Sequence, residues 1–246
     1  CIAALGFTGH SCLNGRTIPI VGVALHQVLA MTISVLPGFT RLTALPEPTQ
    51  LRSQKALQRL LDAGEQLLAA NAFEEASVTQ IAGMASSSVG TFYRVLGDKD
   101  TLSLLLLQRF FQTTVSLIEQ LTEPEQWAAK PLTDFVHTLT ARLAEVYQGR
   151  RGVLRALILR ASRDSVFRDK VHQLNEYIAV RIVAIFQQHL GEVHHPQPHK
   201  AMQAAVHIVL GALNQHTITG NLGHLSNKEV VEELSRILLA YLDIHK

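Results

Sequence analysis

The segment SVTQIAGMASSSVGTFYRVLGDKDTL, from Ser77 to Leu102, constrains the fold more than any other part of the chain. Ser77 and Gln80 have the S-x-x-Q spacing of a capping box, in which each side chain satisfies a backbone amide of the other residue. A helix is therefore expected to begin at this point. One face of that helix is apolar and mostly small, so that a neighbouring helix can approach closely, and consists of Ile81, Ala82 and Ala85.

A second short helix is predicted from Val89 to Leu96, after a turn of three serines. Ser88 is the candidate N-cap, because a serine oxygen accepts from the free amides of a first helical turn. Phe92 and Leu96 are four residues apart and are expected to pack inward. Two short helices joined by such a turn predict a helix-turn-helix, whose second helix enters the major groove of DNA.

Several side chains of this segment are candidates for DNA contacts. Tyr93 can donate its hydroxyl to a phosphate oxygen, and Arg94 adds a bidentate fork. Lys99 is expected in the first turn of the next helix, after Gly97 ends the second helix and Asp98 caps the third, where free amides favour an anion. The predicted DNA-binding residues are Thr79, Ser88, Val89, Gly90, Thr91, Tyr93, Arg94 and Lys99.

The order of residues in this segment resembles the TetR family of bacterial transcriptional regulators. The residues that carry the resemblance are Ile81, Ala82, Ala85, Ser88, Gly90, Thr91, Phe92, Tyr93, Leu96, Lys99, Asp100 and Leu102. It extends over about residues 57–107 and includes the apolar positions of a preceding helix, Leu60, Leu61, Ala63, Leu67 and Leu68, followed by Phe73. The resemblance implies an all-α fold, with an N-terminal three-helix DNA-binding domain and a larger helical domain for ligand binding and dimerisation.

The chain departs from the family pattern at three places. Ala72 stands where the family usually has glycine, which makes Asn71 the candidate for a left-handed helix cap. Ser86 and Ser87 replace Gly-Val in the turn, and the loss of the glycine is expected to strain or reshape the backbone of the turn. Val95 replaces a histidine, which removes one expected DNA contact. These departures leave an alternative function open, a helical binding or interaction module with a decayed DNA-reading head.

The overall composition indicates a globular helical protein without a strong basic patch. The 246 residues are 47% hydrophobic and 17% charged, with a formal net charge of +2. Between Arg52 and Arg109 the cations are balanced by acids, so a DNA-binding field must come from their arrangement. Cys1 and Cys12 both lie near the N-terminus, which fits a cytoplasmic protein.

No sequence pattern indicates an enzyme or a cofactor. The chain has no G-x-S-x-G, P-loop, dinucleotide glycine pattern or H-E-x-x-H. The histidines His194, His195 and His199 cluster in one loop, but they lack the helical spacing of a zinc motif, and no metal is expected. We therefore expect neither catalytic residues nor a metal site.

The first fifty residues differ from the rest of the chain. They are rich in Gly, Pro and Thr, and no residue from Thr17 to Thr40 is charged. The preferred interpretation is a poorly ordered arm or sequence upstream of the natural start, Met31 being the first methionine. The alternative is a membrane or targeting segment, and hence a membrane-anchored regulator. The predicted domains are thus 1–50, the helix-turn-helix domain 51–101 and the ligand-binding and dimerisation domain 102–246.

The larger domain is predicted to consist of helices over about 102–121, 131–149, 152–161, 165–190, 199–218 and 227–244. The resemblance implies a homodimer through the last two helices, and a pocket for a small-molecule effector whose binding releases a repressor from a double-stranded DNA operator. Ligand pockets are mostly apolar with a few polar groups. The candidate ligand-binding residues are Gln112, His137, Tyr147, Asn175, Tyr177, His207 and Asn214. The preferred interpretation requires no membrane partner.

Overall fold

The computed structural model describes residues 10–13, 16–19, 40–43, 50–220 and 225–245. The chain divides into two compact units, residues 1–37 and 38–246. In the first unit, β1 (His10–Leu13) pairs antiparallel with β2 (Arg16–Pro19), so that His10 lies opposite Pro19. No strand was predicted here, because the segment lacks a sustained alternation of apolar and polar residues. Most of the predicted arm, including most of the uncharged run from Thr17 to Thr40, lies outside the described residues.

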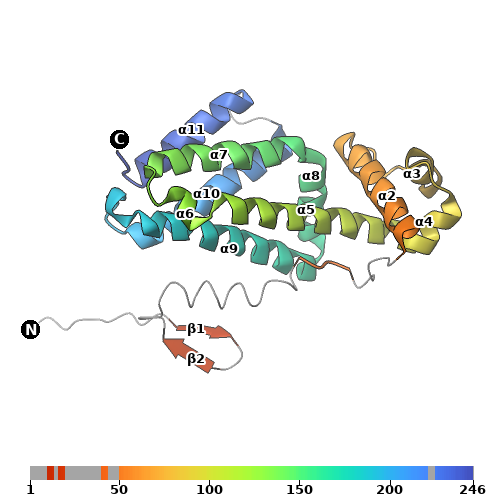
Figure 1. The fold of residues 1–246 in the computed structure, drawn as a ribbon, viewed down its shortest axis with the longest axis horizontal. Helices are drawn as coiled ribbons and strands as arrows, with labels where there is room; N and C mark the ends of the chain where they lie inside the picture. The colour runs from red at the N-terminus through yellow and green to blue at the C-terminus, as the bar shows by residue number, and fades with distance from the viewer. Residues whose placement is uncertain (1–9, 14–15, 20–39, 44–49, 221–224, 246) are drawn as a thin grey trace, which may run out of the picture. The chain divides into compact units, whose positions relative to one another are not determined.

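The second unit is all-α, which confirms the predicted fold class. Three helices, α2 (Leu51–Ala69), α3 (Val78–Met84) and α4 (Val89–Leu96), form a head at the N-terminal end of α5 (Lys99–Leu121) (Figure 1). Their shared core is apolar and nearly inaccessible to solvent, and includes Leu60, Leu61, Phe73, Ile81, Ala82, Ala85, Phe92 and Leu96. These are the apolar positions that the sequence predicts to point inward.

The helix α5 joins the head to the rest of the unit. A Cβ at Gly64 of α2 would lie 2.8 Å from the Leu106 side chain, so glycine allows these two helices to pack closely. Among the described residues, α5 is the one helix long and apolar enough to cross a membrane by length and composition. Its apolar side chains Leu102, Phe111 and Ile118 are fully buried against neighbouring helices. The helix begins at Lys99, directly after the predicted cap Asp98.

The body of the second unit packs around the C-terminal part of α5 (Figure 1). It consists of α6 (Pro124–Trp127), α7 (Leu132–Gly149), α8 (Arg151–Arg163), α9 (Ser165–Gln188), the 3-10 helix η2 (Leu190–Glu192), α10 (Pro198–Thr219) and α11 (Asn227–Tyr241). These bounds agree closely with the predicted helices, except that α6 and η2 were not predicted. Trp127 anchors α6, since its indole nitrogen donates to the Leu121 carbonyl at 2.7 Å and its ring lies 5.0 Å from that of Phe135.

The helix α8 lies between the head and the remaining body helices (Figure 1). Its first turn packs directly on the end of α2. A Cβ added at Gly152 would lie 2.0 Å from the Leu68 carbonyl oxygen and 2.8 Å from the Ala69 nitrogen, both backbone atoms. Only a residue without a side chain therefore fits at this crossing.

Candidate DNA-binding surface

The hydrogen bonds that shape the helix-turn-helix are those predicted from the sequence. At the start of α3, the Ser77 nitrogen donates to Gln80 Oε1 at 2.8 Å and the Gln80 nitrogen donates to Ser77 Oγ at 3.2 Å. At the start of α4, Ser88 Oγ accepts from the Thr91 nitrogen at 3.1 Å. Both caps are confirmed, and together they fix where the two helices begin.

The turns around α3 use left-handed backbone without glycine. Asn71 has φ 55°, as predicted for the residue that takes over the cap of α2. Ser86 has φ 47° in the turn between α3 and α4, the place where glycine is the favourable residue. The Ser87 nitrogen nevertheless donates to the Ala82 carbonyl at 2.9 Å, so the turn closes with a complete hydrogen bond.

The outer face of α4 is exposed along its whole length. Tyr93 is 53% exposed and Val89 36% exposed, and Gly90 and Arg94 are also exposed. Phe92 and Leu96 are buried, as predicted. Val95 is buried as well, so the position where the family has histidine contributes to the core of the head rather than to the exposed face. Thr79 and Ser88 are exposed and Thr91 is half-buried.

Lys99 follows α4 and is held against the head. Its ammonium donates to the Glu74 carbonyl at 2.7 Å and lies 5.1 Å from the centre of the Phe73 ring. The carboxylate of Asp98 caps α5 by accepting from the Thr101 nitrogen at 2.7 Å. The hydrogen bonds that this carboxylate accepts from the backbone and the side chain of Thr101 lower the pKa of Asp98 below its ordinary value. The predicted caps at Gly97, where φ is 80°, and at Asp98 are confirmed.

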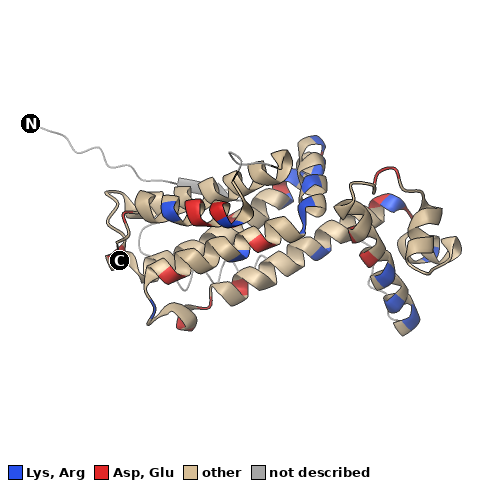
Figure 2. Cartoon of the chain, turned by 90° about the horizontal axis from the view of Figure 1, so that it is seen from above, with Lys and Arg blue, Asp and Glu red and all other residues tan. Residues whose placement is uncertain are grey.

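Positive charge is unevenly distributed over the helical unit. Figure 2 shows Lys and Arg gathered along α8 and along the N-terminal half of α2, where the cations are Arg52, Lys55 and Arg59. Arg109 on α5 is paired with Asp62 at 2.8 Å and Glu65 at 3.5 Å, so it adds little to the field around the head. The cations near the head that could contribute to a DNA-binding field are therefore few and local, as the sequence indicated.

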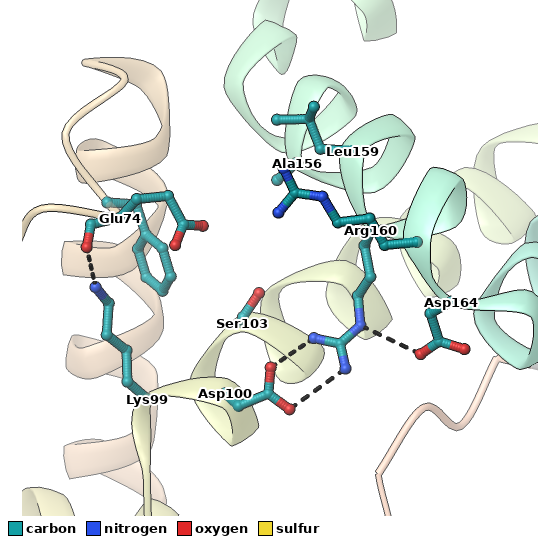
Figure 3. Close-up of a pocket in the computed structure, with 10 residues that line it drawn as sticks. Glu74, Lys99, Asp100, Ser103, Ala156, Leu159, Arg160 and Asp164 are labelled. Carbon is teal, nitrogen blue, oxygen red and sulfur yellow. Dashed lines mark hydrogen bonds and ion pairs between the residues drawn. The ribbon is translucent and has the colours of Figure 1, made fainter.

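A cleft of about 550 Å³ lies between the head and α8 (Figure 3). Glu74 and Lys99 line one side, and Leu159 and Arg160 line the other. At its floor the Arg160 guanidinium donates to both carboxylate oxygens of Asp100, at 2.6 and 3.3 Å. Arg160 Nε is buried and has no hydrogen-bond partner among the described residues.

A further polar contact joins α8 directly to the head. Arg155 Nη1 donates to Asn71 Oδ1 at 2.7 Å, so the residue in the left-handed cap of α2 is also held by the body. The sequence shows several arginines in α8, but it gives no indication of which acids or amides they meet. The contacts of Arg155 and Arg160 were therefore missed.

The predicted ligand-binding residues lie outside this cleft. Tyr147 and Tyr177 are buried in the body, and burial raises the pKa of both phenols. The Tyr177 hydroxyl donates to Glu119 Oε1 at 2.8 Å. Asn175 and Asn214 are half-buried, whereas Gln112, His137 and His207 are exposed. The seven are thus spread between the interior and the surface.

The histidines of the loop before α10 contact other aromatic rings and do not form a three-histidine cluster. The His194 ring stacks on that of His245 at 6.0 Å, and the His195 ring lies 5.3 Å from that of Tyr241. Within the described part of the chain, no three His, Cys, Asp or Glu side chains are grouped so that they could hold a metal ion.

Comparison with known proteins relates the chain to solved structures. The sequence matches no protein-family model and no curated protein. A protein from Mesorhizobium loti that is assigned to the TetR family of transcriptional regulators superposes with a TM-score of 0.64 at 19% identity, covering 79% of this chain and 98% of that one. GusR from Salmonella enterica gives 0.58 at 18% identity, covering 82% of this chain and 100% of that one.

A third similar structure is PfmR, a TetR-family regulator from Thermus thermophilus, with a TM-score of 0.58 at 17% identity and coverage of 74% of this chain and 97% of that one. At identities this low, the structural similarity shows the fold alone. The coverage shows that nearly the whole length of each of these three proteins is matched. The chain therefore has the all-helical fold of the TetR family of transcriptional regulators.

Proposed function

We propose that the protein is a dimeric transcriptional regulator that binds an operator through α4 and is released by a small-molecule effector. The observation that carries this proposal is the exposed face of a firmly capped α4, with Tyr93 53% exposed while Phe92 and Leu96 are buried behind it. A helix held in this way can enter the major groove without unfolding its own core. The predicted DNA-binding residues Thr79, Ser88, Val89, Gly90, Thr91, Tyr93, Arg94 and Lys99 form the proposed interface.

The intact caps at Ser77, Ser88 and Asp98 count against a decayed head. A surface released from DNA binding has no need to keep an aromatic hydroxyl and a guanidinium side by side in solvent. Tyr93 and Arg94 fit phosphate oxygens, because a phenol donates one hydrogen bond and a guanidinium two parallel ones. Lys99 retains two further N–H donors beyond its bond to Glu74 and is proposed to reach a neighbouring phosphate.

Dimerisation is proposed through α10 and α11. Large apolar side chains remain exposed on both helices: Ile208 is 53% exposed and Ile218 46% on α10, and Ile237 is 50% exposed on α11. Exposed apolar groups gathered on adjacent helices favour a partner surface of the same kind. Two heads held by one dimer would bind two half-sites spaced by about one helical turn or a multiple of it.

An effector would act by binding more tightly to a body conformation whose heads no longer match both half-sites. The proposed ligand groups are the polar residues of the apolar body helices predicted above, from Gln112 to Asn214. The contacts of α8 with the head, through Gly152 and Arg155, and with Asp100 at the start of α5, through Arg160, supply a direct mechanical connection between the two parts.

The test is DNA binding by the full chain. Sites selected from a random duplex library, and the region upstream of the protein's own gene, would be measured by gel shift and fluorescence anisotropy. Tyr93→Phe is expected to weaken binding to all sequences alike, by about two- to ten-fold, because a phosphate contact carries no base information. Thr138→Val removes a hydroxyl on α7, outside the head and the proposed dimer interface, and serves as the control. Absence of any sequence-selected site would refute the proposal.

A further inference from the structure

The N-terminal residues of a recognition helix are those that reach base edges in the major groove. In α4 these are the cap Ser88 and the first-turn residues Val89 and Gly90, all exposed. Their chemistry therefore decides which bases the head distinguishes, whereas Tyr93 and Arg94 stand a turn further along.

The hydroxyl of Ser88 is committed within the protein. Its oxygen accepts from the Thr91 nitrogen at 3.1 Å, and the hydroxyl donates to Thr91 Oγ1 at 3.0 Å. Using Ser88 to read a base would cost the helix its cap, which is worth about 1 kcal/mol in general. Ser88 is thus a structural residue first, and its neighbour Val89 is the side chain left to meet the bases.

Gly90 adds a separate observation. A Cβ at this position would lie 3.9 Å from Ser88 Oγ and would meet no other atom within 4 Å, and the backbone is not left-handed. Neither packing nor conformation within the described chain therefore requires glycine here, although glycine in a helix is less stable than alanine. The bare backbone next to Val89 suits a surface that must approach this turn closely.

Val89 has only methyl groups to offer. Placed against a base edge that carries hydrogen-bond donors or acceptors alone, they would exclude water without replacing its hydrogen bonds. The C5-methyl group of thymine is the apolar group that the bases present in the major groove. We propose that Val89 selects thymine in each half-site by packing its methyl groups on this C5-methyl group.

This inference rests on the proposed DNA-binding function, and its test separates the two. Operators are first selected from a random library with the wild-type full chain. Each thymine of the best operator is then replaced by deoxyuridine, which removes the C5-methyl group and keeps the hydrogen-bonding pattern. At one thymine per half-site, the replacement is expected to weaken binding about four-fold, the effect of one small buried apolar group.

The variant Val89→Ala assigns this effect to a residue. It is expected to bind the thymine operator more weakly than wild type and to lose the discrimination between thymine and deoxyuridine at that position. Val89 is exposed and alanine favours helix, so the variant should fold, which circular dichroism would verify. Val166→Ala, at a 69% exposed position on α9, is the matched control and should keep full discrimination.

The outcomes are distinct. Selected operators that bind equally well with deoxyuridine at every position, or Val89→Ala discriminating as wild type does, would overturn the role of Val89 while leaving DNA binding intact. Failure to select any operator would overturn the proposed function and this inference with it. Discrimination that is lost only in Val89→Ala would support the inference.

Discussion

At the scale of single residues, Ser86 shows how local chemistry can tolerate an unfavourable angle. Its φ of 47° lies in the left-handed region, which costs an L-residue about 1–2 kcal/mol. The sequence predicted that the loss of the turn glycine would strain or reshape this turn. The structure retains the turn, with the backbone of Ser86 in the left-handed region. Asn71, with φ 55°, meets the same demand more easily because asparagine tolerates this region.

Replacing Ser86 with glycine is expected to stabilise the protein. Glycine relieves the left-handed strain but has more freedom in the unfolded chain, so the free energy of unfolding should rise by about 0.5–1 kcal/mol. Urea denaturation followed by circular dichroism would measure the change. Ser87→Gly is the matched control: Ser87 does not have a positive φ, so its replacement should lower the stability slightly. Equal effects of both substitutions would contradict the role of strain.

A substitution of Lys99 can distinguish whether this cation stabilises the fold, contacts DNA, or does both. Its bond to the Glu74 carbonyl braces the loop between α2 and α3, while its proposed second role is a phosphate contact. Lys99→Gln is expected to weaken binding to all DNA sequences alike and to reduce the slope of log affinity against log salt by about 0.9 per subunit. Lys200→Gln, an exposed lysine at the start of α10, should leave the slope unchanged. A slope unaltered by Lys99→Gln would make this residue a brace alone.

At the scale of elements, the sequence predicted helices that carry their own start and stop signals. The α3–α4 unit was predicted with its caps because Ser77, Gln80, Ser88 and Gly97 act on atoms a few residues away. The short α6 was missed, since it depends on the burial of Trp127 against Phe135, a tertiary contact. The same reason explains why the partners of the α8 arginines could not be predicted: Asp100 is 60 residues from Arg160 and Asn71 is 84 from Arg155.

The crossing of α8 over α2 gives a prediction at this scale. Alanine normally stabilises a helix relative to glycine by about 1 kcal/mol. At Gly152, however, the new Cβ would overlap the Leu68 carbonyl, which is backbone and cannot move aside. Gly152→Ala is therefore expected to lower the free energy of unfolding by about 1–3 kcal/mol. Thermal unfolding of the purified protein would measure it.

Gly83, in α3, supplies the matched control for this substitution. A Cβ there would meet nothing within 4 Å, so Gly83→Ala should be neutral or stabilising by up to about 1 kcal/mol. A Gly152→Ala variant as stable as Gly83→Ala would show that α8 does not pack tightly on the head. It would also contradict the connection through which an effector is proposed to move the head.

At the scale of the whole molecule, the described contacts complete a head and a body but leave apolar surface on α10 and α11. The sequence alone could not separate an interface from an internal core here, because α10 is apolar nearly all round. The structure buries one side of α10, including Met202, Val206 and Leu213, and leaves Ile208 and Ile218 exposed. The proposed homodimer accounts for this second apolar face.

Charge placed on that face should separate the subunits. Ile208→Asp on α10 and Ile237→Asp on α11 are each expected to sediment as a monomer of about 27.1 kDa, whereas wild type should sediment at twice that mass. Burying an unpaired carboxylate in a symmetric interface is costly, and symmetry places each substitution in the interface twice. The expected loss of operator affinity is large, because a single head binds one half-site without the second to hold it. Val166→Asp, at a position 69% exposed on α9, should remain dimeric. If the Ile208→Asp and Ile237→Asp variants both stay dimeric, the interface must lie on another face of the protein. Different helices would then set the spacing of the two heads.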